Sequence, residues 1–329
     1  MRSDRYSMKK NRISIHALAK HLGVSPGTVS RVINNRDRVK AETRERVLSA
    51  AKELGFAPQA AARRPEISIV TEEDYLDRIT GYSASLVQHL SFKLTRKGMN
   101  IQLPEQIDEG TETAYINGAI VVTHGAHVNP IMKRLERRVP TVHFDLFENE
   151  ETRYVVRSDH EQAGFLAASH FIETGRKKPA ILCPDGQPPN CQRVAGFKRA
   201  LEGAGHKAND PQCVCIINSG EQFFSSIDRL IKSGVDAIYV PGSSLEALEA
   251  LHILTYVMKL KVPEEVALIG GENSRISSLL NPPLTTIEEP LERLSAEAVN
   301  MLEQLLSGQT PEQRHITLPV RLIRRVTGG

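Results

Sequence analysis

The sequence has 329 residues, enough for two or three compact units that each bury their own core. Its 40% hydrophobic and 25% charged residues are typical of globular proteins and exclude a largely disordered chain. The sequence contains no run of about 18 apolar residues and no apolar core of a signal peptide, so we expect a cytoplasmic protein without a membrane partner.

The net charge of +3 is unevenly distributed. Residues 1–66 contain 15 Lys and Arg but 6 Asp and Glu, a net charge of +9, whereas the remainder contains 27 and 33, a net charge of −6. A basic head on an acidic body favours a head that meets nucleic-acid phosphates. The alternative is an ordinary solvated charged surface.

The pattern in residues 12–57 is that of a helix-turn-helix, and the basic residues 1–11 are expected to form a flexible arm. Apolar residues recur at helical spacing, Gly23 supplies a turn, and Ser25 can cap a second helix that begins at Pro26. A third helix is expected over 41–54. The second helix has the length that enters a major groove.

The outward residues of the second helix are the candidates for reading DNA. Arg31 can donate two hydrogen bonds to guanine, which discriminates by about 1–3 kcal/mol, or it can clamp a phosphate. Pro26 and Gly27 are too short to reach bases, so readout there would be relaxed or depend on DNA shape. The DNA-binding candidates are Ser14, Ser25, Pro26, Gly27, Thr28, Ser30, Arg31, Asn34, Arg63 and Arg64.

From Ile67 onward, short apolar runs alternate with helical stretches, which predicts an α/β fold of parallel strands covered by helices. Two similar halves with a cleft at the carboxyl ends of the strands are expected. The predicted strands are 67–70, 99–103, 119–122, 140–144, 179–183, 213–217, 237–240, 266–269 and 316–318. The predicted helices are 83–97, 130–138, 162–174, 193–203, 221–232, 245–260 and 293–306.

The four cysteines, Cys183, Cys191, Cys213 and Cys215, are too few and too poorly spaced for a disulfide framework. No histidine lies at zinc spacing from Cys213 and Cys215, so we expect core thiols, no metal and no cofactor. The sequence also lacks Gly-x-Gly-x-x-Gly, a P-loop, Gly-x-Ser-x-Gly and His-Glu-x-x-His, so we do not expect an enzyme.

The segment ISIHALAKHLGVSPGTVSRVINNRDRVKAETRERVLSAAKELGFAP, residues 13–58, is similar to the headpiece of the LacI–GalR family of bacterial repressors. The body resembles the same family at Ser158-Asp159-His160, at residues 170–175, at Arg193-x-x-Gly196-Phe197 and at residues 262–266, 281–286 and 322–326. The resemblance implies a homodimeric repressor with a two-subdomain, periplasmic-binding-protein-like body. Its affinity for operator DNA would be set by a small molecule, such as a sugar or related metabolite, bound in the cleft.

The resemblance also implies a division of the chain. The DNA-binding domain would cover 12–57, a hinge 58–66, and the effector-binding and dimerisation domain 67–329. The N-subdomain would comprise about 67–158 and 290–318, and the C-subdomain about 159–289 and 319–329. In the family the hinge carries a leucine that wedges into the minor groove. Pro65 takes its place here, either as a wedge itself or, as we expect, as a stiff break in the linker.

The effector-site candidates come from the same resemblance. Arg193 stands at the start of an expected helix, in the position of the family's ligand-gripping arginine; the alternative is a surface arginine. Glu272 stands where the family usually has an aspartate that accepts ligand hydroxyls. Asp159 could touch the ligand or cap the next helix.

Weaker candidates complete the effector site. Ser243 and Ser244 replace the Asn-Asp that the family often shows, and Ser244 is more suited to capping a helix. Tyr75, Asp77, Arg78 and Tyr82 are suggested only by their position in the first loop. Because of these substitutions, the competing interpretation is a DNA-binding protein with a degenerate cleft, which is constitutive or controlled by another protein.

Overall fold

In the computed structural model the chain forms two compact units, Met1–Arg64 and Pro65–Gly329. The basic arm over 1–11 and most of the hinge lie outside the described residues. The structure describes residues 14–33, 39–54, 64–71, 81–104, 116–122, 130–147, 151–184, 188–206, 213–217, 223–242 and 244–329.

The first unit is a small helical domain with its own core. Ser14 caps its first helix by accepting a hydrogen bond from the Ala17 amide at 3.2 Å, and Gly23 ends this helix with a left-handed φ of 66°. Leu18, Val29 and Val47, one from each helix, are fully buried against one another. The predicted helix-turn-helix is confirmed. Its helices are α1 Ile15–Leu22, α2 Pro26–Ile33 and α3 Ala41–Glu53.

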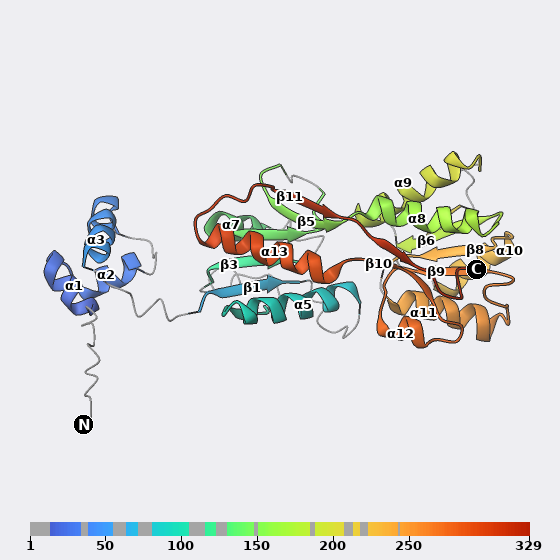
Figure 1. Ribbon diagram of the computed structural model, residues 1–329, viewed down its shortest axis with the longest axis horizontal. Helices are drawn as coiled ribbons and strands as arrows, with labels where there is room; N and C mark the ends of the chain where they lie inside the picture. The colour runs from blue at the N-terminus through green and yellow to red at the C-terminus, as the bar shows by residue number, and fades with distance from the viewer. Residues whose placement is uncertain are drawn as a thin grey trace, which may run out of the picture. The chain divides into compact units, whose positions relative to one another are not determined.

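The second unit contains two six-stranded sheets (Figure 1). All strand pairs of the first sheet are parallel, in the order β11-β5-β4-β3-β1-β2. Helices α5 and α13 pack on one face and α7 on the other. The elements are β1 Glu66–Val70, α5 Tyr82–Arg96, β2 Asn100–Gln102, β3 Gly118–Val121, α7 Pro130–Arg138, β4 Thr141–Phe144, β5 Tyr154–Ser158, α13 Leu291–Leu306 and β11 His315–Leu318.

The second sheet has the order β12-β10-β9-β8-β6-β7, with α8 and α9 on one face and α10 and α11 on the other. Its edge strand β12 is antiparallel to β10, so the expected all-parallel sheet has one exception. The elements are α8 His160–Glu173, β6 Pro179–Pro184, α9 Pro188–Gly203, β7 Val214–Ile217, α10 Phe223–Lys232, β8 Ala237–Val240, α11 Ser244–His252, β9 Ala267–Gly270, α12 Arg275–Leu279, β10 Thr285–Glu288 and β12 Arg321–Ile323.

The chain crosses between the two sheets three times: from β5 to α8, from β10 to α13, and from β11 to β12. Two of these crossings are hydrogen-bonded to each other. The Asp159 amide donates to the Leu318 carbonyl at 2.8 Å, and the Val320 amide donates to Gln162 Oε1 at 2.8 Å. Adjacent crossings of this kind form a connection about which two subdomains can rotate.

Several local predictions were wrong. Strands β5, β10 and β12 were not predicted, because each is only three to five residues long and contains a charged residue. Helix α9 begins at Pro188 rather than at Arg193, since proline is accepted in the first turn of a helix. The helix expected over 245–260 ends at His252 and continues as a π-helical turn, Ile253–Val257. Cys183 is buried as expected, but Cys191 is exposed and is not a core thiol.

No helix in the part of the chain that the structure describes is both long and apolar enough to span a lipid bilayer.

Candidate functional site

The exposed face of α2 presents few long side chains. Ser25 Oγ accepts a hydrogen bond from the Thr28 amide at 3.0 Å and lies 2.9 Å from Thr28 Oγ1, so both hydroxyls are engaged at the start of the helix. Pro26, Gly27 and Arg31 are exposed on the side away from the core. Arg31 is therefore the only long side chain among these three that could reach a base edge.

The other predicted DNA contacts differ in their placement. Ser14 uses its hydroxyl to cap α1, Ser30 is half-buried, and Arg64 is exposed. Asn34 and Arg63 lie outside the described residues. In addition, Arg46 donates from Nη2 to the Leu22 carbonyl at 3.3 Å, which ties α3 to the end of α1 and fixes the orientation of the helices.

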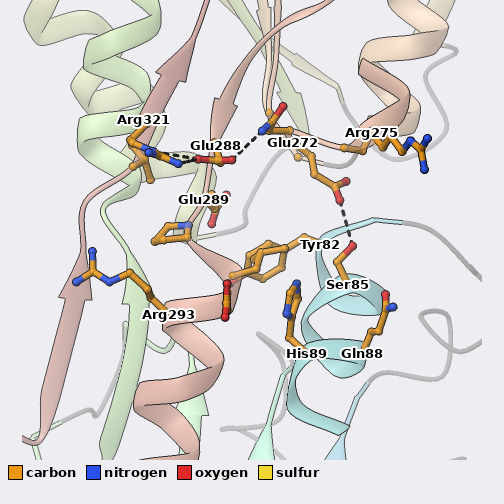
Figure 2. Close-up of a pocket in the computed structure, with 18 of the residues that line it drawn as sticks. Tyr82, Ser85, Gln88, His89, Glu272, Arg275, Glu288, Glu289, Arg293 and Arg321 are labelled. Carbon is orange, nitrogen blue, oxygen red and sulfur yellow. Dashed lines mark hydrogen bonds and ion pairs between the residues drawn. The ribbon is translucent and has the colours of Figure 1, made fainter. Parts of the chain in front are cut away.

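A cleft of about 680 Å³ opens between the two sheets at the carboxyl ends of their strands (Figure 2). This volume is within the usual range for sites that bind small molecules. Helix α5 and the first turn of α13 supply one wall, and the segment that follows β9, the end of β10 and the segment that precedes β12 supply the other. The lining side chains include Tyr82, Ser85, Gln88, His89, Glu272, Asn273, Arg275, Glu288, Glu289, Glu292, Arg293 and Arg321.

Glu272 lies in the cleft, and its Oε1 accepts a hydrogen bond from Ser85 Oγ at 3.1 Å (Figure 2). Its place is set by a close backbone approach just before it. A Cβ on Gly271 would lie 2.4 Å from the Gly242 amide nitrogen, so only glycine fits there. The Ser85–Glu272 contact joins the two subdomains directly across the cleft.

Arg193 is buried, with 7% of its surface exposed, so the surface alternative is wrong. Its Nη2 donates to Glu289 Oε1 at 2.8 Å and its Nη1 to Asn190 Oδ1 at 3.0 Å. Burial by itself lowers the pKa of the Arg193 guanidinium, but attraction to Glu289, Tyr239 and Asp145 outweighs burial and raises the pKa above its ordinary value. Arg193 therefore reaches the cleft through Glu289, which is part of the lining.

Glu289 has a hydrogen-bonding position to spare. Its side chain is 10% exposed, and among the residues that the structure describes nothing donates to its Oε2. A buried carboxylate oxygen without a partner costs free energy unless a ligand supplies a donor. Glu289 belongs to the cleft lining and therefore has an acceptor position that no described residue uses.

A buried network links the two subdomains beside this pair. Tyr82 Oη donates to Asp145 Oδ2 at 2.9 Å, and His160 Nε2 lies 2.8 Å from Asp145 Oδ1. Burial raises the pKa of the Tyr82 hydroxyl, and the nearby charges of Asp145 and Glu289 raise it further, well above its ordinary value. Tyr82 thus stays protonated and acts as a hydrogen-bond donor.

The structure brings only some of the predicted effector residues together. Asp159 caps α8, accepting from the Gln162 amide at 2.8 Å, and is not among the residues that line the cleft. Tyr75, Asp77 and Ser243 lie outside the described residues. Ser244 begins α11, and its side chain also lies outside the description.

The sequence reasoning missed Asp145, His160 and Glu289 as site residues. Asp145 directly follows β4, and the rule that ligands bind at the carboxyl ends of strands could have selected it. Glu289 directly follows β10, a strand that was not predicted, so no signal placed it at the cleft. His160 follows β5, which was also not predicted, and the resemblance at Ser158-Asp159-His160 was the signal that could have found it.

The chemistry of the cleft suits a ligand with several hydroxyl groups. Glu288 is already satisfied, because Asn273 Nδ2 donates to its Oε1 at 2.7 Å and Arg321 Nε to its Oε2 at 3.0 Å. Glu272 and Glu289 are lining carboxylates whose oxygens can accept from hydroxyl groups, and Tyr82 and Ser85 are hydroxyls on the α5 wall. Such converging groups fix the orientation of a polar ligand.

Comparisons with known proteins bear on both units. Residues 14–59 match the model of bacterial regulatory proteins, lacI family, and residues 168–327 match a periplasmic binding protein-like domain. The HTH-type transcriptional regulator CelR of Thermobifida fusca is 28% identical over 97% of this chain and 99% of the relative. Catabolite control protein A of Priestia megaterium is 26% identical over 94% of this chain and 97% of the relative. A solved structure of the regulator CelR in complex with cellobiose matches this chain with a TM-score of 0.70 and 26% sequence identity. The match covers 96% of this chain and 100% of the CelR chain.

Proposed function

Because this chain belongs to the lacI family of bacterial regulatory proteins and is a DNA-binding transcriptional regulator, we propose that it is a repressor whose operator affinity is set by a small molecule. The effector is a neutral, hydroxyl-rich metabolite of the sugar class, bound in the cleft between the subdomains. The observation that carries this proposal is Glu289 at the cleft wall, whose buried Oε2 receives no hydrogen bond from any residue in the described ranges. The cellobiose complex of a relative supports the same ligand class.

Operator recognition rests on Arg31 and on two copies of the chain. One helix of eight residues reads few base pairs, so the repressor acts as a homodimer that binds two half-sites. A second copy would also cover apolar side chains that are otherwise exposed on α12, among them Ile276 and Leu279. The boundaries of the proposed DNA-binding domain, hinge and subdomains are those given from the sequence.

Control of operator affinity by the effector would use the three crossings between the sheets, about which the two subdomains can rotate. Glu272 belongs to one subdomain and Ser85 to the other, and they are hydrogen-bonded directly across the cleft. A ligand that takes over these groups changes the angle between the subdomains, and the hinge transmits the change to the DNA-binding domains. Coupling of this kind is typically worth about 1–3 kcal/mol in operator affinity.

The DNA-binding part is tested by selecting genomic fragments with the purified protein at two salt concentrations. We expect one near-palindromic motif of about 16–20 bp, degraded at one position of each half-site in Arg31→Ala. Lys20→Ala, which removes an exposed charge from α1, serves as the control and should leave the motif unchanged. Fragments that share no motif and are released uniformly by salt would show binding to phosphates alone.

The effector part is tested by calorimetric titration of the operator-bound and free protein with neutral sugars, starting with cellobiose. We expect saturable binding that weakens at least about tenfold in Glu289→Gln and changes little in Glu292→Gln, an exposed carboxylate of the same cleft. Operator binding that no sugar changes would favour the alternative, a DNA-binding protein with a degenerate cleft that is constitutive or controlled by another protein.

A further inference from the structure

A second pocket, of about 660 Å³, lies in the first subdomain, away from the cleft. It is found at the amino ends of β4 and β5, whereas the cleft lies at the carboxyl ends of the strands. The two pockets therefore occupy opposite ends of the same parallel sheet. The second pocket is lined by Lys133, Glu136, Arg137, Arg138, Val139, Pro140, Thr141, His143, Thr152, Arg153, Tyr154 and Leu305.

This basic pocket concentrates positive charge on an acidic body. Four of its lining residues are Lys or Arg and one is Glu, although residues 67–329 as a whole carry a net charge of −6. Lys133 and Arg137 are four residues apart on α7, so their side chains share one face of the helix and repel each other. Neither has an ion-pair partner within the part of the chain that the structure describes.

The dipole of helix α7 explains the presence of only some of the four cationic side chains in the basic pocket. Cations in the last turn of a helix are stabilised by its dipole, which explains Arg137 and Arg138. Lys133 lies a turn earlier, and Arg153 comes from the segment that precedes β5. Arg153 is held there by its ion pair with Glu136, whereas the presence of Lys133 has no such local cause.

The single carboxylate of the pocket does not neutralise the exposed cations. Glu136 Oε2 accepts from Arg153 Nε at 3.2 Å and from Arg153 Nη2 at 3.0 Å, and Glu136 Oε1 lies 3.2 Å from His143 Nε2. Burial raises the pKa of Glu136, but the hydrogen bonds and charges of His143 and Arg153 outweigh it, and the pKa is lowered overall. Glu136 is therefore an ionised partner of Arg153 and His143, which leaves the charges of Lys133 and Arg137 directed at the pocket.

We propose that the basic pocket binds a small phosphate-bearing molecule at a second site, separate from the effector cleft. The lysine and arginine side chains of Lys133 and Arg137, one turn apart on α7, can together donate to the several oxygens of a phosphate group. A volume of about 660 Å³ suits a metabolite. The pocket is recessed, since His143 and Arg153 lie in its wall with 3% and 13% of their side chains exposed. The backbone of a DNA duplex is convex and therefore fits such a recess less well than a small molecule does.

The test uses the full chain, with inorganic pyrophosphate as the probe in calorimetric titrations at low salt. The variant Lys133→Gln/Arg137→Gln removes two charges and their mutual repulsion, so it should fold as well as the wild type; thermal unfolding checks this. The control Lys177→Gln/Lys261→Gln removes two exposed charges from the other subdomain. Each titration is repeated with the protein saturated by a DNA duplex, which occupies the helix-turn-helix domain.

We expect one pyrophosphate site per chain that persists on the DNA-bound protein. Its dissociation constant should rise about tenfold or more in the Lys133/Arg137 variant and stay unchanged in the control. Absence of saturable binding, or the same affinity in all three proteins, would overturn the proposal. Binding that disappears when the duplex is present would also overturn it and would assign the pocket to DNA phosphates. The slope of DNA affinity against salt would then fall in the Lys133/Arg137 variant.

Discussion

Gly164 of α8 and Gly196 of α9 each face the backbone of the other helix with no room for a side chain. A Cβ on Gly164 would lie 1.8 Å from the Arg193 carbonyl oxygen, and a Cβ on Gly196 would lie 1.8 Å from the Glu161 carbonyl oxygen. This reciprocal packing explains the glycine in Arg193-x-x-Gly196. It fixes the turn of α9 that carries Arg193 against the backbone of α8.

The first prediction concerns this packing. Gly164→Ala and Gly196→Ala should each lower the free energy of unfolding by about 3 kcal/mol or more, because backbone cannot move aside as a flexible side chain can. Gly203→Ala, in the same helix α9, is the matched control, since nothing lies within 4 Å of its Cβ. It should change stability by less than about 1 kcal/mol. Urea unfolding followed by circular dichroism measures all three, and equal losses would contradict the proposed packing role.

The second prediction concerns the buried ion pair between Arg193 and Glu289. Arg193→Ala should cost about 3–5 kcal/mol of unfolding free energy, because it leaves the Glu289 carboxylate buried without its partner. The further change Glu289→Gln should recover much of this loss. Arg199→Ala, also in α9, removes an arginine that is 58% exposed and pairs with Glu161, and should cost less than about 1 kcal/mol. Additive effects of the two changes at the buried pair would show that its partners are not coupled.

The third prediction concerns the hydroxyl of Tyr82. Tyr82→Phe should lower the unfolding free energy by about 1–3 kcal/mol, because Asp145 is 3% exposed and loses a donor that water cannot easily replace. Tyr256→Phe is the control, since Tyr256 is 60% exposed, and it should stay within about 0.5 kcal/mol of the wild type. If the two substitutions have the same effect, the network does not stabilise the fold.

The fourth prediction is a pH dependence that arises from Glu136. Its pKa in the folded protein is lowered below the ordinary value of 4.5, so its contribution is fully present above that value. The contribution is lost as the pH falls through the lowered, folded-state pKa. Glu136→Gln should therefore be less stable than the wild type by about 2–4 kcal/mol at neutral pH, and the difference should shrink as the pH falls below 4.5.

The matched control for this pH experiment is Glu202→Gln, which changes an exposed carboxylate on α9. Its stability should follow that of the wild type at every pH. A difference between wild type and Glu136→Gln that stays constant across the acid range would mean that the carboxylate charge of Glu136 is not what stabilises the protein.

The sequence by itself determined the helix-turn-helix and the alternation of strands and helices. Gly23, Ser14 and Ser25 act within one or two turns of their own position, and the buried residues Leu18, Val29 and Val47 fall on the predicted helix faces. Strands such as Ala237–Val240, buried on both faces, are continuous apolar runs. Local backbone preferences and burial leave periodic signals that a single sequence carries.

Only the tertiary structure decided which residues form the cleft. Arg193 meets Glu289 across 96 positions of the sequence, and Glu272 meets Ser85 across 187. The short strand β10, which brings Glu289 to the cleft, and the short strand β5, which precedes the buried His160, leave no periodic signal. Their charged residues lie at the crossings between the sheets. Sequence spacing records which face of an element is buried, whereas the partner of a charged side chain depends on how distant elements pack, and that is fixed only when the whole chain folds.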